Sequence, residues 1–210
     1  MIVVLTGAPG AGKGTQADLV RDRLGFRKIS TGDALRRHVS LGTEIGKKAA
    51  SIMESGRLVP DDVLLEILNQ EIGADPKEKI LLDGYPRNIE QAKALASIGG
   101  VHKVAKAINL DVDQEQLLVR LTGRRVCKQC GKSYHLAGKM PKNTDSCDAC
   151  GGMIVQRPDD QPERVKVRLG VYANETRPVL SFYEGIKALV TINGNRSTED
   201  VFDEIKKQLG

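Results

Sequence analysis

The chain has 210 residues, of which 40% are hydrophobic and 28% are charged, a composition typical of soluble globular proteins. Its net charge is +5, but Trp is absent and aromatic residues make up 3%, which leaves little material for stacking single-stranded nucleic acid. The N-terminal apolar run is too short for a signal peptide or a membrane span. We therefore expect a cytoplasmic protein with one sizeable core and small insertions, and with no nucleic-acid or membrane partner.

The first strand is predicted over Ile2–Leu5, an apolar run that leads directly into the glycine-rich segment Gly7–Thr15. Residues 15–24 then show helical spacing, and Gly25 is the predicted C-terminal stop. Strand, glycine loop and helix start together define a phosphate-binding loop. Backbone N–H groups of such a loop surround a polyphosphate, and Lys13 is placed to reach the β and γ phosphates. A plain glycine turn, the alternative, would leave Lys13 unexplained.

Later apolar runs alternate with helical stretches and predict four more strands, at Phe26–Ile29, Lys79–Leu82, Val104–Leu110 and Leu189–Ile192. This alternation predicts an α/β fold, a parallel five-stranded sheet of the P-loop NTPase type with helices on both faces. One long helix is predicted over Pro162–Ile186, with a break near Pro178.

Two stretches depart from this alternation and are interpreted as insertions. Residues 30–59 predict short helices broken by Gly42, Gly46 and Gly56, without a strand. Residues 123–160 contain Gly, Pro and every cysteine of the chain, with almost no long apolar pattern.

The cysteines form two Cys-x2-Cys pairs separated by sixteen residues: Cys127, Cys130, Cys147 and Cys150. This spacing predicts a zinc site with four thiolate ligands, one ion per chain. Disulfides are the alternative, but the expected cytoplasm is reducing. Because four thiolates complete the tetrahedron, the zinc is expected to be structural. A zinc ribbon that binds nucleic acid remains an alternative, although a zinc tetrathiolate lowers the net charge to about +3.

Three further segments carry candidate phosphate chemistry. The run Ile80–Asp83 ends an apolar strand in a carboxylate, which can hold Mg²⁺ directly or through water, or can simply cap the next turn. Gly84–Arg87 presents an arginine as an anion clamp, because guanidinium binds phosphate in a bidentate manner. Ser30–Arg36 places a hydroxyl and an arginine at a helix start. Each could be an ordinary capped helix, but together they suggest a second nucleotide site.

The phosphate loop itself departs from the general motif, since Gly14 follows Lys13 and the hydroxyl is displaced to Thr15. With this change the chain resembles the nucleoside monophosphate kinases, and in particular the adenylate kinase family with a long, zinc-bearing lid. The resemblance covers essentially the whole chain and rests on Gly7–Thr15, Ser30–Arg36, Gly56–Val59, Asp83–Arg87, Gln91, Leu121–Arg125, Arg157–Asp160 and Arg168.

The resemblance implies three domains and a reaction. The P-loop core would comprise residues 1–29, 60–122 and 161–210, the AMP-binding domain residues 30–59, and the lid residues 123–160. The implied activity is reversible, Mg²⁺-dependent phosphoryl transfer, ATP + AMP = 2 ADP, which serves nucleotide biosynthesis and salvage, in a monomer that binds ATP, AMP and ADP. A lid that closes over the site would exclude water.

The site residues follow by position. The implied ATP contacts are Gly10, Ala11, Gly12, Lys13, Gly14, Thr15, Arg124, Ser133, Tyr134 and Asn195. The implied AMP contacts are Thr31, Arg36, Arg57, Leu58, Val59, Gly84, Tyr85, Pro86, Arg87, Gln91, Arg157 and Arg168. The implied catalytic set is Lys13, Arg87, Arg124, Arg157 and Arg168, which with Mg²⁺ would stabilise the charge of the moving phosphoryl group.

Within this family, Thr31 and Gln91 match the pattern for adenine, since a Gln side chain can present a donor and an acceptor to the base. A purely structural or regulatory nucleotide-binding protein is the remaining alternative. Such a protein would not need Arg87 and Arg168.

Overall fold

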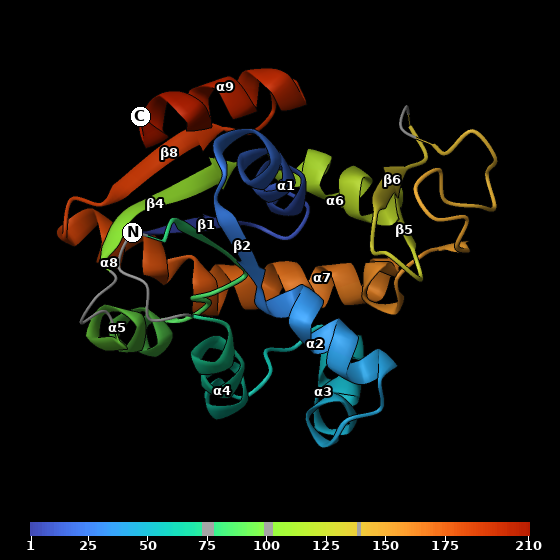
Figure 1. The fold of residues 1–210 in the computed structure, drawn as a ribbon, viewed down its shortest axis with the longest axis horizontal. Helices are drawn as coiled ribbons and strands as arrows, with labels where there is room; N and C mark the ends of the chain where they lie inside the picture. Colours follow the sequence, from blue (N-terminus) through green and yellow to red (C-terminus); the bar gives the residue numbers. More distant parts are fainter. Residues whose placement is uncertain (73–77, 99–102, 138–139) are drawn as a thin grey trace.

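The computed structural model describes residues 1–72, 78–98, 103–137 and 140–210 (Figure 1). The predicted core range 60–122 thus includes residues 73–77 and 99–102, and the predicted lid range 123–160 includes 138–139, which lie outside the described part. The strands are β1 Ile2–Gly7, β2 Arg27–Ser30, β3 Ile80–Asp83, β4 Val104–Asp111, β5 Arg124–Cys127, β6 Ser133–His135, β7 Ile154–Val155 and β8 Leu189–Asn193. The α-helices are α1 Lys13–Leu24, α2 Thr31–Ser40, α3 Glu44–Glu54, α4 Asp61–Glu71, α5 Ile89–Ile98, α6 Gln114–Thr122, α7 Pro162–Val171, α8 Pro178–Gly185 and α9 Thr198–Leu209.

The central sheet confirms the predicted α/β fold. In the described residues it has five strands in the order β2-β3-β1-β4-β8, and every neighbouring pair is parallel. Strand β1 is central, with Val3 beside Leu81 of β3 and Leu5 beside Ile108 of β4. All five predicted strands are present, and their observed bounds differ from the predicted ones by one or two residues. The carboxyl ends of β1, β2 and β3 therefore lie side by side, which brings the phosphate loop, Thr31 and Asp83 to one edge.

Two apolar clusters cover the two faces of this sheet. Ile2 and Val4 of β1 belong to a cluster with residues of α2–α5 and α8, whereas Val3 and Leu5 belong to a cluster with α1, α6 and α9. Successive side chains of a strand point to opposite faces, so the continuous apolar run of β1 supplies both cores. Figure 1 shows α1 and α9 on one side of the sheet and α4, α5 and α7 on the other.

The predicted helix breaks are correct in part. Gly25 ends α1 in the left-handed conformation at φ 70°, and Gly42 and Gly56 flank α3. Gly46, however, lies inside α3, so the prediction of a break there is wrong. A Cβ atom at Gly46 would lie 2.1 Å from the His38 carbonyl oxygen, so the glycine permits close packing of α3 on α2.

The predicted long helix Pro162–Ile186 changes geometry just before Pro178. Residues Tyr172–Thr176 form a π-helical turn, in which the Arg177 N–H donates to the Tyr172 carbonyl at 2.8 Å. Pro178 has no N–H and cannot continue the regular ladder, so the wider turn accommodates it. The prediction of a break near this proline is thus confirmed as a local irregularity.

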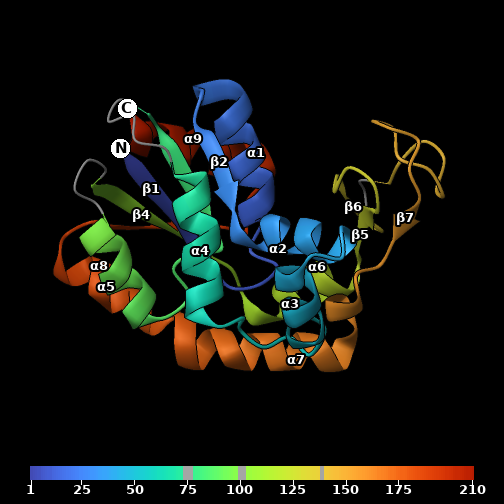
Figure 2. The same cartoon turned by 60° about the horizontal axis from the view of Figure 1, so that its bottom comes forward.

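The segment with the cysteines contains a small antiparallel sheet that the sequence analysis did not predict. Its strands have the order β6-β5-β7, with Arg125 opposite Tyr134 and Val126 opposite Val155. Figure 2 shows this segment projecting beyond the end of α7, away from the central sheet. Within the described residues, no helix is both long and apolar enough to cross a membrane.

Candidate functional site

The phosphate loop joins β1 to α1 and is shaped by close packing. Gly7 and Gly10 adopt φ 137° and 86°, and a Cβ atom would lie 2.7 Å from the Leu110 carbonyl oxygen at Gly7 and 2.9 Å from the Leu121 Cγ at Gly10. Side chains at these two positions would be strained and would clash. The loop is therefore held against β4 and α6, with the N-terminus of α1 directed at its centre.

Lys13 and Asp83 face each other at this edge of the sheet. The Lys13 ammonium donates to the carbonyl oxygens of Gly7 and Ala8, at 2.7 and 2.9 Å. Burial lowers the pKa of Lys13 to about 8, against the opposing attraction of Asp83, and burial also raises the pKa of Asp83. A Cβ atom at Gly14 would lie 3.8 Å from the Asp83 carboxylate. The buried carboxylate thus faces the position where the general motif carries its metal-binding hydroxyl, and an oxygen ligand there suits Mg²⁺.

Arg87 is held in place by hydrogen bonds of its own backbone and side chain. Its Nε donates to the Gly84 carbonyl at 2.8 Å, and its N–H donates to Oε1 of Gln91 at 2.7 Å. Burial lowers the pKa of Arg87, and repulsion from Arg168 acts in the same direction. A buried guanidinium that is repelled by a second one favours a bound anion. Phosphate oxygens would replace its lost hydration and offset the repulsion from Arg168.

Three further arginines meet around the adjacent carboxylates of Asp159 and Asp160. Asp160 is 0% exposed and accepts from Arg124 at 2.5 and 2.7 Å and from Arg168 at 2.8 Å. Arg157 pairs with Asp159 at 2.5 Å, and burial together with repulsion from Arg36 and Arg124 lowers the Arg157 pKa to about 9. Arg124 and Arg168 also act electrostatically on Lys13. The structure therefore gathers all five predicted catalytic cations at one place.

Three further predicted AMP contacts, Arg57, Leu58 and Val59, line a cleft. This cleft of about 530 Å³ is lined by Arg57, Leu58, Val59, Pro60, Asp61, Asn88, Val171 and Glu175. This volume falls in the range of small-molecule sites. Thr31 and Gln91 are each 1% exposed; the Thr31 hydroxyl donates to the Gly84 carbonyl at 2.9 Å, and the Gln91 amide nitrogen donates to Asp61 at 2.6 Å. Tyr85 is buried, and Pro86 follows it in this loop.

Three residues implied by the resemblance, Arg36, Tyr134 and Asn195, have partners of their own. The Arg36 guanidinium is half-exposed and pairs with Asp33 on the same helix. Ser133 is exposed, whereas Tyr134 is buried and its hydroxyl lies 3.2 Å from Cys147 Sγ. The Asn195 side chain hydrogen-bonds to Asp113 at 3.0 and 3.1 Å, beside the end of the central sheet.

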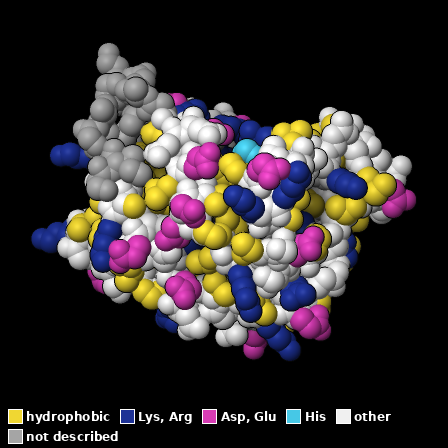
Figure 3. Space-filling view, turned by 90° about the horizontal axis from the view of Figure 1, so that it is seen from below, with side chains coloured by type: hydrophobic (Ala, Val, Ile, Leu, Met, Phe, Trp, Pro, Cys, Tyr) yellow, Lys and Arg dark blue, Asp and Glu magenta, His cyan; other side chains and the backbone are white. Residues whose placement is uncertain are grey.

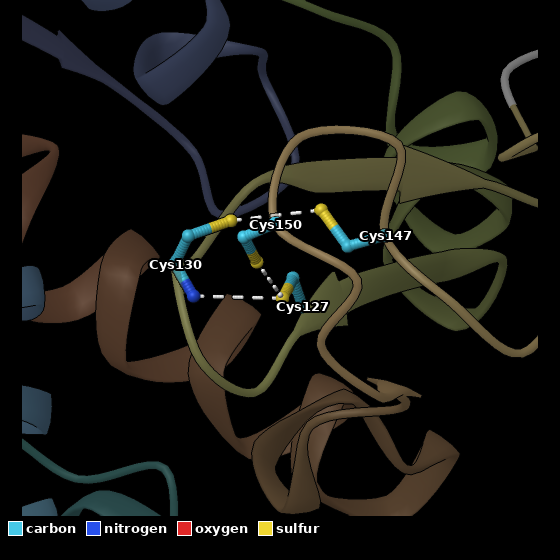
Figure 4. Close-up of side chains that lie close together, drawn as sticks. All are labelled: Cys127, Cys130, Cys147 and Cys150. Atoms are coloured by element: carbon cyan, nitrogen blue, oxygen red, sulfur yellow. Dashed lines mark hydrogen bonds between the residues drawn. The ribbon is translucent and has the colours of Figure 1, made fainter.

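The four cysteines converge in the projecting segment, as Figure 4 shows. Their Sγ atoms all lie within 4.8 Å of one another, with Cys127–Cys150 at 3.5 Å and Cys130–Cys147 at 3.6 Å. All four thiols are free, and these distances resemble the spacing of about 3.8 Å expected across a tetrahedral zinc with bonds of about 2.3 Å. The donor set therefore fits a metal ion. A hydrogen bond from the Tyr134 hydroxyl lowers the pKa of Cys147 to about 6, which favours the thiolate that a metal requires.

Three acidic residues of the site were missing from the sequence-based set. Asp159 and Asp160 hold the arginines just described, and Asp61 accepts from both Asn88 and Gln91. Asp159 and Asp160 stand within the matched segment Arg157–Asp160, next to an arginine in an otherwise loop-like sequence. Their position next to Arg157 could have indicated a role in holding that arginine, whereas Asp61 looks like the ordinary start of a helix.

A strand–glycine loop–helix junction with a buried lysine, opposite a strand-end aspartate and a group of arginines, defines a P-loop phosphotransferase of the nucleoside monophosphate kinase class. The family model for adenylate kinase matches residues 5–188. Adenylate kinases from Caldicellulosiruptor saccharolyticus, Clostridium tetani and Methanosarcina barkeri are 46%, 43% and 46% identical. Each match covers 100% of this chain and 98–99% of the relative. The chain belongs to the adenylate kinase family.

Proposed function

We propose that this protein catalyses ATP + AMP = 2 ADP in the presence of Mg²⁺. The observation that carries the proposal is the position of the cations. Lys13 of the phosphate loop lies within electrostatic range of Arg87, Arg124 and Arg168, and residues 57–61 line a separate cleft. A protein that only bound one nucleotide would need the loop and Lys13. The additional arginines suit a second phosphate group brought up to the first.

We assign the nucleotide contacts accordingly. Residues Gly10–Thr15 and Arg124 would hold the ATP phosphates, and Ser133, Tyr134 and Asn195 would contribute at the edge of that site. Thr31, Arg36, the Arg57–Val59 backbone, Gly84–Arg87 and Gln91 would hold AMP. Arg157 and Arg168 would contact the transferring phosphoryl group. The assignment is supported by the cleft beside residues 57–59 and by the shared cation group.

The chemistry needs alignment and charge stabilisation rather than a nucleophilic side chain. An AMP phosphate oxygen attacks the γ-phosphorus of ATP, the bond to the β-phosphate oxygen breaks, and two ADP molecules result. Lys13, Arg87 and the other arginines are placed to stabilise the charge on the moving group. Mg²⁺ would be held at Asp83, directly or through water, and would neutralise β- and γ-phosphate charge when bound.

The insertions have separate roles in this proposal. Residues 30–59 form the AMP-binding domain, and residues 123–160 form a lid that closes to exclude water from the aligned γ-phosphate. Zinc, one ion per chain, binds Cys127, Cys130, Cys147 and Cys150 and stabilises the lid fold. The protein acts as a cytoplasmic monomer in nucleotide biosynthesis and salvage. The face shown in Figure 3 mixes basic and acidic side chains, which suits small phosphate ligands better than a nucleic-acid backbone.

A coupled assay for ADP formed from ATP and AMP tests the proposal directly. We expect turnover that requires AMP and Mg²⁺, and tight inhibition by two adenosines joined through a polyphosphate, because that inhibitor would occupy both sites at once. An inhibitor affinity no better than that of ATP would indicate a single nucleotide site. No ADP from ATP plus AMP, together with tight nucleic-acid binding, would overturn the proposal in favour of a zinc ribbon.

A further inference from the structure

Thr176 makes a hydrogen bond that its position in a helix does not require. It is the last residue of the π turn and is 8% exposed, and its hydroxyl donates to the Arg87 carbonyl at 2.8 Å across 89 residues of sequence. A threonine inside a helix ordinarily bonds to the carbonyl three or four residues earlier. Here the hydroxyl is instead directed at the loop that carries the phosphate arginine.

The wider turn accounts for this direction. In a regular α-helix the Arg177 N–H would bond to the carbonyl of residue 173, but it bonds to Tyr172 at 2.8 Å. The extra residue in this turn changes which side chains face the core. Pro178 therefore has a consequence at the site, because the turn that accommodates it leaves the Thr176 hydroxyl facing Arg87.

Both backbone polar groups of Arg87 are thus bound by side chains of other elements. Its N–H donates to Gln91 of α5 and its carbonyl accepts from Thr176 of the π turn, at 2.7 and 2.8 Å. The next residue, Asn88, donates to Asp61 of α4 at 3.1 and 3.2 Å. Fixing the backbone of a catalytic residue limits the positions that its side chain can sample.

We propose that Thr176 is a positioning residue that fixes Arg87 for the AMP phosphate and the transferring phosphoryl group. The proposal rests on the proposed function of Arg87. The same hydroxyl links the Arg87 loop to the π turn that follows α7, the helix that carries Arg168. Arg87 and Arg168 therefore keep their relative positions. ATP binding at the phosphate loop does not depend on this contact.

The test is steady-state kinetics of ADP formation with Thr176→Val, which keeps the shape and removes the hydroxyl. We expect kcat/KM for AMP to fall roughly tenfold, with a raised KM for AMP, because the part-buried Arg87 carbonyl loses its donor. The KM for ATP should stay unchanged. Thr176→Ser, which keeps the hydroxyl, should remain within about twofold of the parent. Exposed Thr191→Val on β8 is the matched control.

A double-mutant cycle separates positioning from general stability. In an Arg87→Ala background, Thr176→Val should cause little further loss, because its effect passes through Arg87. Parental kinetics for a folded Thr176→Val protein would overturn the proposal, as would an equal loss in both backgrounds or an equal rise in the KM for ATP. Failure of both Thr176→Val and Thr176→Ala to fold would make Thr176 a structural residue and overturn it too. An inactive parent protein would instead contradict the proposed function.

Discussion

The central sheet and the projecting lid are stabilised by different means. On the two faces of the sheet, large apolar clusters bury residues such as Val3, Val4 and Leu82 completely. In the lid, the corresponding cluster of described residues contains Cys127, Tyr134 and Cys147, with Ile154 packed against it. Burial of apolar area can account for the first region, but two thiols and one tyrosine cannot stabilise the second. We therefore expect the lid fold to depend on the metal ion that its cysteines are proposed to hold.

The arginines of the site lie where the two regions meet, and two of them are lid residues by sequence. Arg124 and Arg157 flank the small sheet, yet their guanidinium groups pair with Asp160 and Asp159, next to the start of α7. Arg168 of α7 joins the same group. We therefore expect the metal to determine the stability of the lid. The phosphate chemistry should depend instead on the contacts at the junction with the core.

Loss of the metal should have the largest effect. Replacing Cys147 and Cys150 by Ser removes two ligands, and structural zinc contributes about 10 kcal/mol or more to comparable small folds. We expect the thermal unfolding midpoint to fall, while activity at low temperature partly survives because Arg124 and Arg157 keep their contacts with Asp160 and Asp159 beside α7. Calorimetry and the ADP assay measure the two effects, with exposed Thr144→Ser as the control. Complete loss of the chemical step in a lid that remains folded would show that the metal is catalytic.

Loss of the Asp160 charge should destabilise the junction between lid and core. Asp160→Asn leaves Arg124 and Arg168 without their shared carboxylate, and breaking a buried ion pair costs about 3–5 kcal/mol. We expect urea unfolding to report a loss of this size, with metal content unchanged. Exposed Asp145→Asn provides the matched control in the lid. A loss below about 1 kcal/mol would mean that the arginines are held by other contacts.

Loss of Arg87 should affect the chemistry alone. Arg87→Ala is expected to lower kcat by roughly 10²-fold or more, as removal of a transition-state donor does, which corresponds to about 2.7 kcal/mol. Metal content and the thermal midpoint should remain close to those of the parent. Near-parental turnover in a folded Arg87→Ala protein would remove Arg87 from the site.

The smallest predicted effect is a proton taken up on ATP binding. The lowered pKa of Lys13, about 8, means that Lys13 is mostly neutral at pH 9, and bound phosphates would restore its charge. Titration calorimetry in buffers of different ionisation enthalpy should show uptake of up to about one proton at pH 9 and almost none at pH 7. The Cys147→Ser, Cys150→Ser variant should give the same result. Zero uptake at pH 9 would contradict the assigned position of Lys13.

The same group has a consequence for stability. Lys13 has a lower pKa in the folded state than its ordinary value of 10.5, so the folded protein binds fewer protons between pH 8 and 10.5. The contribution of Lys13 to the free energy of unfolding therefore rises across this window as the pH increases.

Much of the core could be predicted because its signals are local. The apolar run of β1, the glycine loop and the stop at Gly25 are each determined by neighbouring residues, and the alternation of strands and helices gave the parallel sheet. Lys13 and Arg87 could be proposed from their own motifs, whereas Arg124, Arg157 and Arg168 were assigned only through the family resemblance. Their grouping in space depends on the topology of the chain, so their spacing along the sequence does not predict it.

The errors have physical reasons. Gly46 looked like a helix breaker, but it permits α3 to approach His38 of α2. The lid strands were missed because β7 has two residues and β6 has three, too few for a periodic pattern. The contact between the Tyr134 hydroxyl and Cys147 Sγ was not predicted either. That contact links distant residues and leaves no trace in the local sequence.

Hydrogen exchange with and without a chelator, on the whole chain, tests the central comparison most directly. After metal removal, the account predicts that amides of β5, β6 and the segment around Cys147 lose protection, while β1, β3 and β4 remain as protected as before. Equal loss of protection in the central sheet, or full protection of the lid without metal, would contradict it.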